Sequence, residues 1–304
     1  MKLTMLWSML KETVNDWLDD KASRLAAALA FYTLLSIAPL LVLAVSIAGL
    51  VFGADAARGE IAGQLRSLMG PEASEGVQKL LTSAQSPREG ILATLVGVVV
   101  LLFGASGVFG ELQESLNTVW EVTTRPGRGV IGLVKDRFFS FTMVLGVAFL
   151  LLVSLVISTL LSALGGSIHP SAPAFAVVWQ GVNFVVSFVS ATVLFALIFK
   201  VIPDVRIAWK SVWIGALATA FLFTIGKHLL GLYLGRASVA SPYGAAGSVV
   251  VLVIWVYYSA QILFLGAEFT QVFARATGSR LEPTAKAMRT GEANAPAIPP
   301  RAAS

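Results

Sequence analysis

Six stretches of apolar residues recur along the chain, and each is long enough to cross a lipid bilayer as a helix, which takes about 20 residues. Charged residues gather between these stretches and are nearly absent within them. The pattern predicts an all-α fold, a polytopic membrane protein with six transmembrane helices. The predicted spans are residues 25–53, 90–110, 138–165, 174–201, 208–234 and 247–268.

A different pattern occupies residues 1–23, before the first span. Apolar residues recur there with helical period, and the charged residues fall largely elsewhere on the helical wheel. This predicts an amphipathic helix on the membrane surface. A helix that packs under the bundle, as in a soluble protein, fits the pattern about equally well. The apolar positions are Leu3, Leu6, Trp7, Leu10, Val14, Trp17 and Leu18.

The longest predicted loop, residues 54–89, holds two short apolar runs with helical period on either side of Gly70-Pro71. We therefore expect a helical outer loop. The end of the chain contains three prolines and few apolar residues, which predicts a disordered tail. The predicted regions are thus an interfacial helix at 1–23, a membrane domain at 24–275 and a cytoplasmic tail at 276–304.

Basic residues are distributed unevenly over the two predicted sides of the membrane. Sixteen Lys and Arg residues fall in the two terminal segments and in the loops that share a side with them, and five fall on the opposite side. Because cytoplasmic segments carry the excess of Lys and Arg, this predicts a multi-pass protein with both termini in the cytoplasm. The remaining basic residue, Lys227, lies inside the fifth span.

Composition supports the membrane class, since 56% of the residues are hydrophobic and only 13% are charged. The net charge of +5 suggests a nucleic-acid partner, but the basic residues flank apolar runs and form no continuous patch, so we expect no nucleic acid. With no cysteine and two histidines, a zinc site would need several carboxylates. A phosphate-binding glycine loop is absent from the sequence, and the acidic pair Asp19-Asp20 is typical of a solvated helix face. We expect no metal, no cofactor and no enzymatic activity.

Lys227 is the most unusual residue of the predicted spans. It falls on a stripe of small and polar residues spaced at helical intervals, which predicts that it faces other helices rather than lipid. A lysine near the centre of a membrane helix costs about 2.5–3.5 kcal/mol, so an interior partner such as an anionic group would offset the cost. The alternative is that its long side chain reaches the outer end of the helix. The stripe consists of Ala216, Ala220, Thr224, Lys227, Gly231 and Gly235.

Further polar residues follow single faces of the first, fourth and sixth predicted spans. Pro39 also removes a backbone donor and leaves the carbonyl of Leu35 without its helical partner. These residues could line a pathway for a substrate, or they could only form hydrogen bonds between helices. The pathway candidates are Lys227, Tyr32, Ser36, Pro39, Gln180, Asn183, Ser187, Thr224, Tyr257 and Gln261. The acidic candidates at the inner edge are Glu111, Glu114 and Glu268.

Several sequence blocks resemble the YihY/BrkB family of bacterial inner-membrane proteins, in family order over about residues 24–275. The blocks are RLAAALAFYTLLSIAPLL from Arg24, GASGVFGELQESLNTVWEV from Gly104, IPDVRIAWKSVWIGAL from Ile202, GKHLLGLYL from Gly226 and SPYGAAGSVVVLVIWVYYSAQILFLGAEFTQVFAR from Ser241. The resemblance implies six transmembrane helices in a bacterial inner membrane with both termini cytoplasmic. It implies no settled activity, because members carry an old ribonuclease label and a virulence-factor label, and some are linked to envelope lipid handling.

Two functions therefore stay open. The first is a transporter or lipid translocase that acts in envelope homeostasis, with membrane lipids as partners and an anionic lipid or another amphipathic molecule as substrate. The alternative is a non-transport envelope or virulence factor that serves as a docking or scaffold protein. We reject the ribonuclease label, because RNA cleavage would need a metal cluster or an acid–base pair and a basic groove with stacking aromatics. The sequence gives no signal for the oligomeric state.

Overall fold

The computed structural model describes residues 3–53, 107–125, 173–236 and 246–293, with short pieces between 58 and 82 and residue 243. The predicted span 138–165 and most of the span 90–110 lie outside the described residues. The fold of the described part is mostly helical. The helices are α1 (Leu3–Asp19), α2 (Ala22–Phe52), α6 (Pro173–Val201), α7 (Trp209–Arg236), α8 (Gly247–Ala276) and α9 (Thr290–Ala293), and residues 107–119 are also helical.

Three of the described helices are long and apolar enough to cross a membrane, at Phe184–Val201, Trp209–Leu234 and Gly247–Ala276. They coincide with the predicted fourth, fifth and sixth spans. Helix α2 matches the predicted first span and continues through Pro39 to Phe52. The described residues of the predicted outer loop, beyond residue 57, are also helical. A total of six spans stays a prediction.

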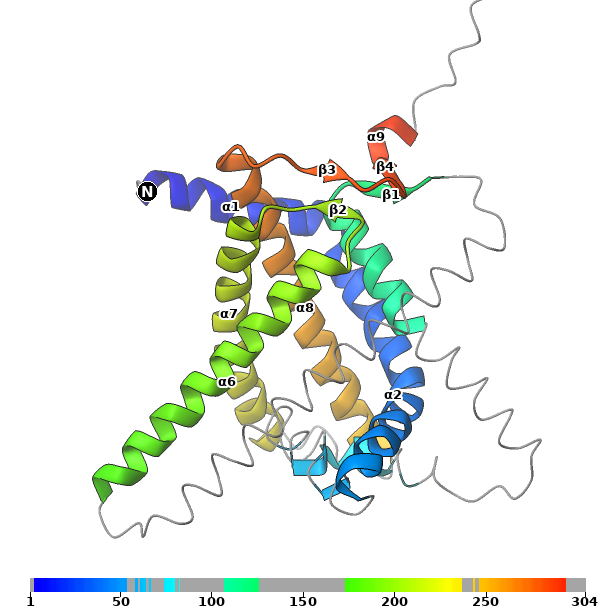
Figure 1. Cartoon of the computed structure of the whole chain (residues 1–304), viewed down its shortest axis with the longest axis vertical. Coiled ribbons are helices and arrows are strands. Elements are labelled where there is room, and N and C mark those ends of the chain that lie inside the picture. The colour runs from blue at the N-terminus through cyan, green and yellow to red at the C-terminus, as the bar shows by residue number, and fades with distance from the viewer. Residues whose placement is uncertain are drawn as a thin grey trace, which may run out of the picture.

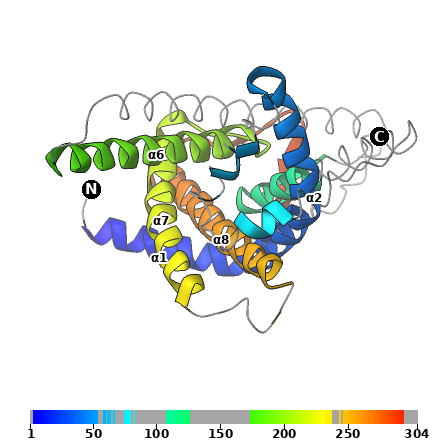
Figure 2. The same cartoon turned by 90° about the horizontal axis from the view of Figure 1, so that it is seen from below.

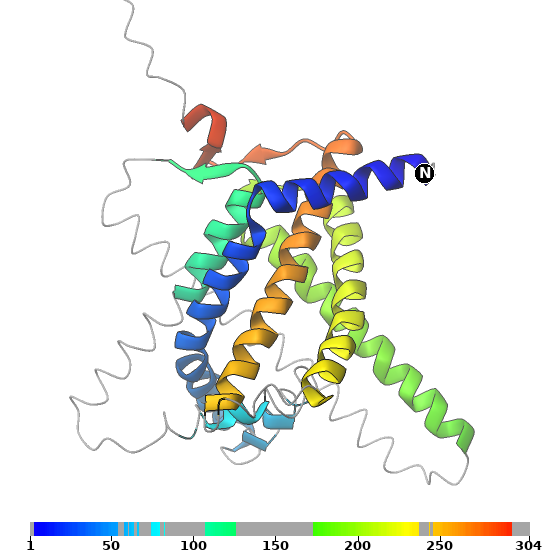
Figure 3. The ribbon, with the colours of Figure 1, turned by 180° about the vertical axis from the view of Figure 1, so that it is seen from behind.

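Helix α8 lies in the middle of the described bundle, with α2 and α7 packed on either side of it (Figure 1). Helix α6 packs on α7 near one end of the bundle and diverges from it toward Pro173 (Figures 1 and 3). Helix α1 lies across that same end and packs on α8, so that α1 and α6 flank the α7–α8 pair from opposite sides (Figure 2). Both described chain ends lie at this end of the bundle, which we call the terminal end.

Two faces of α1 have opposite surroundings. Met9 and Thr13 are buried, and Met9 joins a cluster with Val272 and Phe273 of α8. The opposite face is apolar and exposed, and its members are Trp7, Leu10, Val14 and Leu18. The helix thus packs on the bundle, as one interpretation predicts, and still presents the apolar face that a membrane-surface helix needs.

Short strands close the terminal end, and they involve residues for which the sequence predicted a disordered tail. Strand β1 (Val122–Thr124) pairs antiparallel with β4 (Ala287–Arg289), and β2 (Val205–Arg206) pairs antiparallel with β3 (Glu282–Pro283). Residues 282–293 are ordered because two loops distant in sequence supply backbone hydrogen-bond partners. The amide of Thr284 donates to the carbonyl oxygen of Asp204 at 2.9 Å, and the amide of Thr290 donates to the carbonyl oxygen of Glu121 at 3.0 Å. Composition alone does not reveal such pairing.

The α7–α8 contact depends on a reciprocal pair of glycines and threonines. Thr219 of α7 lies on Gly266 of α8, and Thr270 of α8 lies on Gly215 of α7. Each threonine hydroxyl donates to the carbonyl oxygen four residues earlier in its own helix, at 2.7 Å for Thr219 and 2.6 Å for Thr270. The buried hydroxyl therefore has a hydrogen-bond partner while the threonine packs against the glycine. Absence of a β-carbon at each glycine allows this close approach, as small residues do between membrane helices. The crossing fixes the last turns of α8, which carry the site described next.

Candidate functional site

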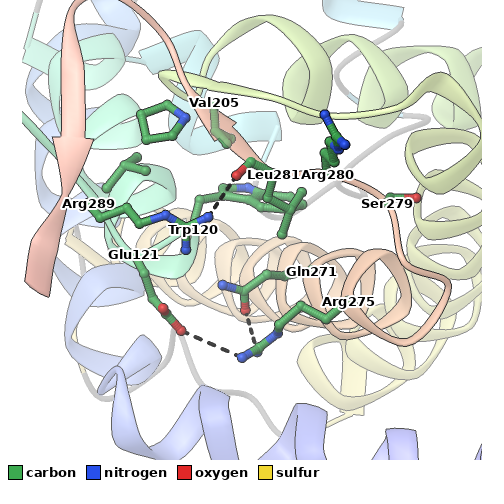
Figure 4. A pocket seen from close by; sticks show the side chains of 11 residues that line it. Trp120, Glu121, Val205, Gln271, Arg275, Ser279, Arg280, Leu281 and Arg289 are labelled. Carbon is green, nitrogen blue, oxygen red and sulfur yellow. Dashed lines mark hydrogen bonds and ion pairs between the residues drawn. The ribbon is translucent and has the colours of Figure 1, made fainter.

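A pocket of about 280 Å³ opens at the terminal end, where two helix ends face each other (Figure 4). The helix 107–119 leads into β1 through a turn at Trp120 and Glu121, and the φ of 53° at Glu121 lies in the left-handed region. Helix α8 ends at Ala276, and Gly278, with φ of 67°, turns the chain back toward β3 and β4. The lining residues are Trp120, Glu121, Val122, Val205, Gln271, Arg275, Ser279, Arg280, Leu281, Pro283 and Arg289.

Hydrogen bonds hold two of the lining arginines in place. Nη2 of Arg275 donates to Oε1 of Gln271 at 2.8 Å and to Oδ2 of Asp16 in α1 at 2.5 Å, and its Nη1 lies 3.6 Å from Oε1 of Glu121. Nη2 of Arg289 donates to the carbonyl oxygen of Leu281 at 2.9 Å (Figure 4). The Arg275 contacts join α8 to α1 and to the turn before β1, and the Arg289 bond joins β4 to the segment before β3.

The unused polar groups of the pocket are mainly donors. The indole N–H of Trp120 is buried and has no hydrogen-bond partner within the described part of the chain. Arg280 is exposed at the rim, and three arginines face one glutamate around the wall. Guanidinium groups and N–H donors bind phosphate and carboxylate oxygens, often in bidentate geometry. The chemistry of the wall therefore fits an anionic group.

A cluster of carboxyl groups lies beside the pocket. Glu268 of α8 is 0% exposed, and neither of its carboxyl oxygens has a hydrogen-bond partner among the residues that the structure describes. Its side chain interacts with Asp20, in the turn between α1 and α2. Burial raises the pKa of the Asp20 carboxyl above its ordinary value; contact with Glu268 opposes the rise, and the carboxylates of Glu121, Asp16 and Asp19 add to it.

Comparison with known proteins identifies the family. A family model described as virulence factor BrkB matches residues 13–290. The chain belongs to the BrkB family. A UPF0761 membrane protein of Pseudomonas paraeruginosa is 28% identical over 250 residues, which make up 82% of this chain and 58% of that protein. A UPF0761 membrane protein of Aggregatibacter aphrophilus is 25% identical over 268 residues, covering 86% of this chain and 90% of that protein.

The BrkB-family assignment confirms the resemblance drawn from the sequence blocks and shows that the chain is a membrane protein. The chain spans a little more than half the length of the Pseudomonas relatives. No solved structure matches it. Neither family description names a substrate or a reaction.

In this BrkB-family chain, the intramembrane candidates do not line the pocket at the terminal end. Lys227 is half-buried on α7, and it forms no ion pair with any residue that the structure describes. The hydroxyl of Thr224 donates to the carbonyl of Ala220 in its own helix at 2.7 Å. The predicted stripe is fully buried at Ala216 and Ala220 and exposed at Gly231, and the packed face continues instead through Gly226, Leu230 and Leu234. Lys227 thus lies at the margin of the helix contact.

The candidates on other helices are spread over the bundle. Ser36 of α2 is buried, and Tyr32, one turn earlier, is partly exposed and lies near Gly107. On α8, Tyr257 is partly exposed, and the carbonyl oxygen of the Gln261 side chain is buried without a partner in the described residues. Ser187 of α6 is exposed. The side chains of Pro39, Gln180 and Asn183 lie outside the described residues.

The acidic candidates separate into two groups. Glu268 lies beside the pocket, whereas Glu111 and Glu114 lie on the helix 107–119 away from its wall. Glu111 is half-buried, and burial raises the pKa of its carboxyl, with the Glu114 carboxylate acting in the same direction and a hydrogen bond with Ser115 opposing both. Glu114 is exposed.

Sequence reasoning missed the pocket residues and a buried polar clamp beside them. The backbone amide of Asp204 donates to Oδ1 of Asn117 at 2.8 Å, and Oδ2 of Asp204 accepts from Asn117 at 3.2 Å and from Gln113 at 3.1 Å. This clamp ties the α6–β2 loop to the helix 107–119. The partners are about 90 residues apart, so no local pattern joins them. From the sequence, the arginines of the pocket contributed only to the Lys and Arg count that predicts which side of the membrane each loop faces.

Proposed function

We propose that this protein is a transporter of the bacterial inner membrane that moves an anionic amphiphile, in the first instance an anionic lipid, and so acts in envelope homeostasis. The pocket at the terminal end is the proposed head-group site on the cytoplasmic side. One observation carries the proposal: a donor-rich, arginine-lined pocket at the end of a bundle of apolar helices. An amphiphile needs both a polar site for its head group and an apolar surface for its tail.

Aromatic and basic residues near the pocket support its placement at the membrane–water boundary. Trp209 and Trp213, at the start of α7, are stacked and partly exposed. Nζ of Lys200 lies 5.3 Å from the ring centroid of Trp209 and donates to the carbonyl of Ile207. Tryptophan gathers at head-group level in membrane proteins, and lysines near helix ends direct their charge toward the interface.

Lys227 is the proposed second binding site for the anionic head group, deeper in the membrane. It lies 18 residues after the first residue of α7, which corresponds to about 27 Å along a helix at 1.5 Å per residue. Ionisable residues within membrane helices face the interior or a water-filled path and mark substrate pathways. A charge that is half-buried and unpaired within the described residues fits a transient anionic partner.

The exposed apolar face of α1 favours the second candidate function, a docking or scaffold protein of the envelope. Trp7 on this face is 72% exposed, more than any other large apolar side chain of the described residues. Such a surface could receive a partner protein instead of lipid. The two functions differ in one respect that can be measured, because a scaffold moves no lipid.

The head-group site predicts that Arg280→Gln weakens binding of an anionic lipid. Arg280 is exposed and carries no hydrogen bond in the described structure, so its loss should leave the fold intact. A hydrogen bond to a charged group contributes about 1.5–3 kcal/mol, so binding should weaken by about ten- to a hundredfold. Titration of the purified chain with phosphatidylcholine nanodiscs that contain increasing phosphatidylglycerol measures the effect.

Arg206→Gln is the matched control, because Arg206 is an exposed arginine near the same end that does not line the pocket. It should bind phosphatidylglycerol as the parent does. Equal weakening by both substitutions would indicate a diffuse charge effect and would contradict a head-group site in the pocket.

Orientation can be tested with single cysteines, because the chain contains none. We expect Ala285→Cys, at the terminal end, to react with a membrane-impermeant maleimide only after the inner membrane is opened. Gly59→Cys, which is exposed in the predicted outer loop, should react in spheroplasts without opening. The opposite pattern would place the pocket on the outer side and contradict a cytoplasmic head-group site.

A further inference from the structure

The carboxyl pair beside the pocket has no place in the proposed head-group site. Glu268 is among the largest fully buried side chains of the described residues, yet both of its carboxyl oxygens lack a hydrogen-bond donor there. Its side chain interacts with another carboxyl group, that of Asp20. The turn that carries Asp20 is tightly held, since Lys21 adopts a left-handed φ of 53° and the helices on both sides of it are packed on α8. The two carboxyl groups are thus forced together.

Charged groups around the pair do not neutralise it. From α1 it faces Asp16 and Asp19, from the turn after the helix 107–119 it faces Glu121, and on α8 it faces Arg275. The start of α2 adds Lys21 and Arg24, which are both exposed. Helix α7 contributes Gly215, Ala216 and Thr219 at this level, and none of the three can carry a charge. The cation that acts on Glu268 is Arg275, and its guanidinium also pairs with Asp16 and Glu121.

Two adjacent carboxyl groups in a buried site do not ionise together, because desolvation and mutual repulsion both oppose the second charge. One retained proton removes the repulsion and lets an O–H group of one carboxyl face an oxygen of the other. We propose that Asp20 and Glu268 form a proton-binding site that holds one proton between them, and that its occupancy is coupled to anion binding in the pocket through Asp16 and Arg275. The coupling rests on the proposed head-group site, whereas the proton site itself does not.

Arg275 connects the two sites. The same guanidinium lines the pocket, donates to Asp16 and lies among the carboxyl groups around Glu268. When the pair loses its proton, the added negative charge draws the guanidinium toward the acidic cluster and opposes an anion in the pocket. When the pair binds its proton, the pocket becomes more positive. Anion binding should therefore take up a proton, and by reciprocity the anion should bind more tightly as the pH falls.

The first experiment detects the proton directly in the full-length protein. Infrared difference spectra recorded during a pH titration should show the C=O stretch of a protonated carboxylic acid in the parent at neutral pH. Glu268→Gln, which keeps the shape and cannot ionise, should remove that band, and Asp20→Asn is the second variant. Glu12→Gln, an exposed carboxyl of α1, is the control and should leave the band in place. The same neutral-pH spectrum in the parent and in Glu268→Gln would overturn the proton site.

The second experiment measures the coupling with phosphodiesters, whose charge does not change between pH 5 and 8. Binding of phosphatidylglycerol in nanodiscs should tighten as the pH falls, by at most about tenfold per pH unit for one linked proton. Glu268→Gln should bind tightly at every pH, whereas Glu12→Gln should behave as the parent. The same titration is repeated with the water-soluble head group glycerophosphoglycerol. An affinity for this head group comparable to that for the lipid would assign the site to a free phosphodiester, and binding of the lipid alone would assign it to a membrane lipid.

The outcomes separate the two ideas. No binding of either probe at any pH would overturn the proposed head-group site, and the infrared result would still decide the proton site. Binding that is equally independent of pH in the parent and in Glu268→Gln would overturn the coupling while leaving the head-group site standing. Tighter binding at low pH in the parent, lost in Glu268→Gln, supports both.

Discussion

Gly266→Ala should destabilise the protein by about 1–3 kcal/mol, the usual cost of overpacking a tight contact. A β-carbon at this position would overlap the hydroxyl of Thr219 and lie 2.8 Å from its β-carbon. Neither α7 nor α8 can withdraw easily, because the reciprocal contact between Gly215 and Thr270 lies in the same crossing. The melting temperature of the purified protein in detergent, followed by tryptophan fluorescence, measures the loss.

Two further variants make this prediction specific. Gly231→Ala adds the same methyl group to a helical glycine of α7 with no heavy atom within 4 Å of the new carbon, and it should leave the melting temperature unchanged or raise it slightly. Adding Thr219→Gly to Gly266→Ala exchanges the small and large sides of the contact and should recover part of the stability. A stable Gly266→Ala protein that melts with the parent would contradict the close α7–α8 crossing.

Lys227→Met should abolish lipid transfer while the folded protein is retained. The substitution keeps the length of the side chain and removes its charge, so the insertion cost of about 2.5–3.5 kcal/mol is no longer incurred. Melting temperature and transfer activity, measured side by side, distinguish three roles. Loss of activity with a parental or higher melting temperature indicates that Lys227 binds the substrate. Loss of both would indicate a hydrogen-bonding role between helices.

A third result for Lys227→Met would contradict its proposed role. If the lysine only extends its side chain to the helix end, the variant should transfer lipid at the parental rate and melt with the parent. Thr224→Ala is the control on the same helix, because the Thr224 hydroxyl already bonds to its own backbone and should have little effect on transfer.

The helices could be predicted from the sequence because a bilayer imposes a length and an apolar composition that show in any one segment. The predicted span 174–201 corresponds to α6, and 208–234 corresponds to α7 within two residues. The predicted end of the sixth span at Glu268 is eight residues too early. Helix α8 continues to Ala276 because α1 covers its polar last turns, where Gln271 is buried.

The pocket could not be predicted from local patterns. Its wall combines the end of the helix 107–119, β2, the last turns of α8 and the strands that follow. Arg280 and Arg289 lie in the segment that composition assigned to a disordered tail, and pairing with β1 and β2 orders it. Glu268 was recognised as an acidic residue at the end of a span, but its burial against Asp20 depends on how α1 turns into α2. On α7 the predicted stripe is buried at Ala216 and Ala220, whereas Gly231 is exposed because the packed face passes to Leu230 and Leu234.

The most direct test of the proposed function is lipid transfer by the purified protein in sealed vesicles. Phosphatidylcholine vesicles that carry a trace of phosphatidylglycerol with a fluorescent, chemically quenchable tail report how fast the label reaches the outer leaflet. We expect the parent protein to transfer this anionic lipid much faster than protein-free vesicles do, Lys227→Met to transfer it at the protein-free rate, and Arg280→Gln to be slower than the parent. Transfer at the protein-free rate, by protein shown to be folded by its melting transition, would contradict a transporter of anionic amphiphiles and favour the scaffold.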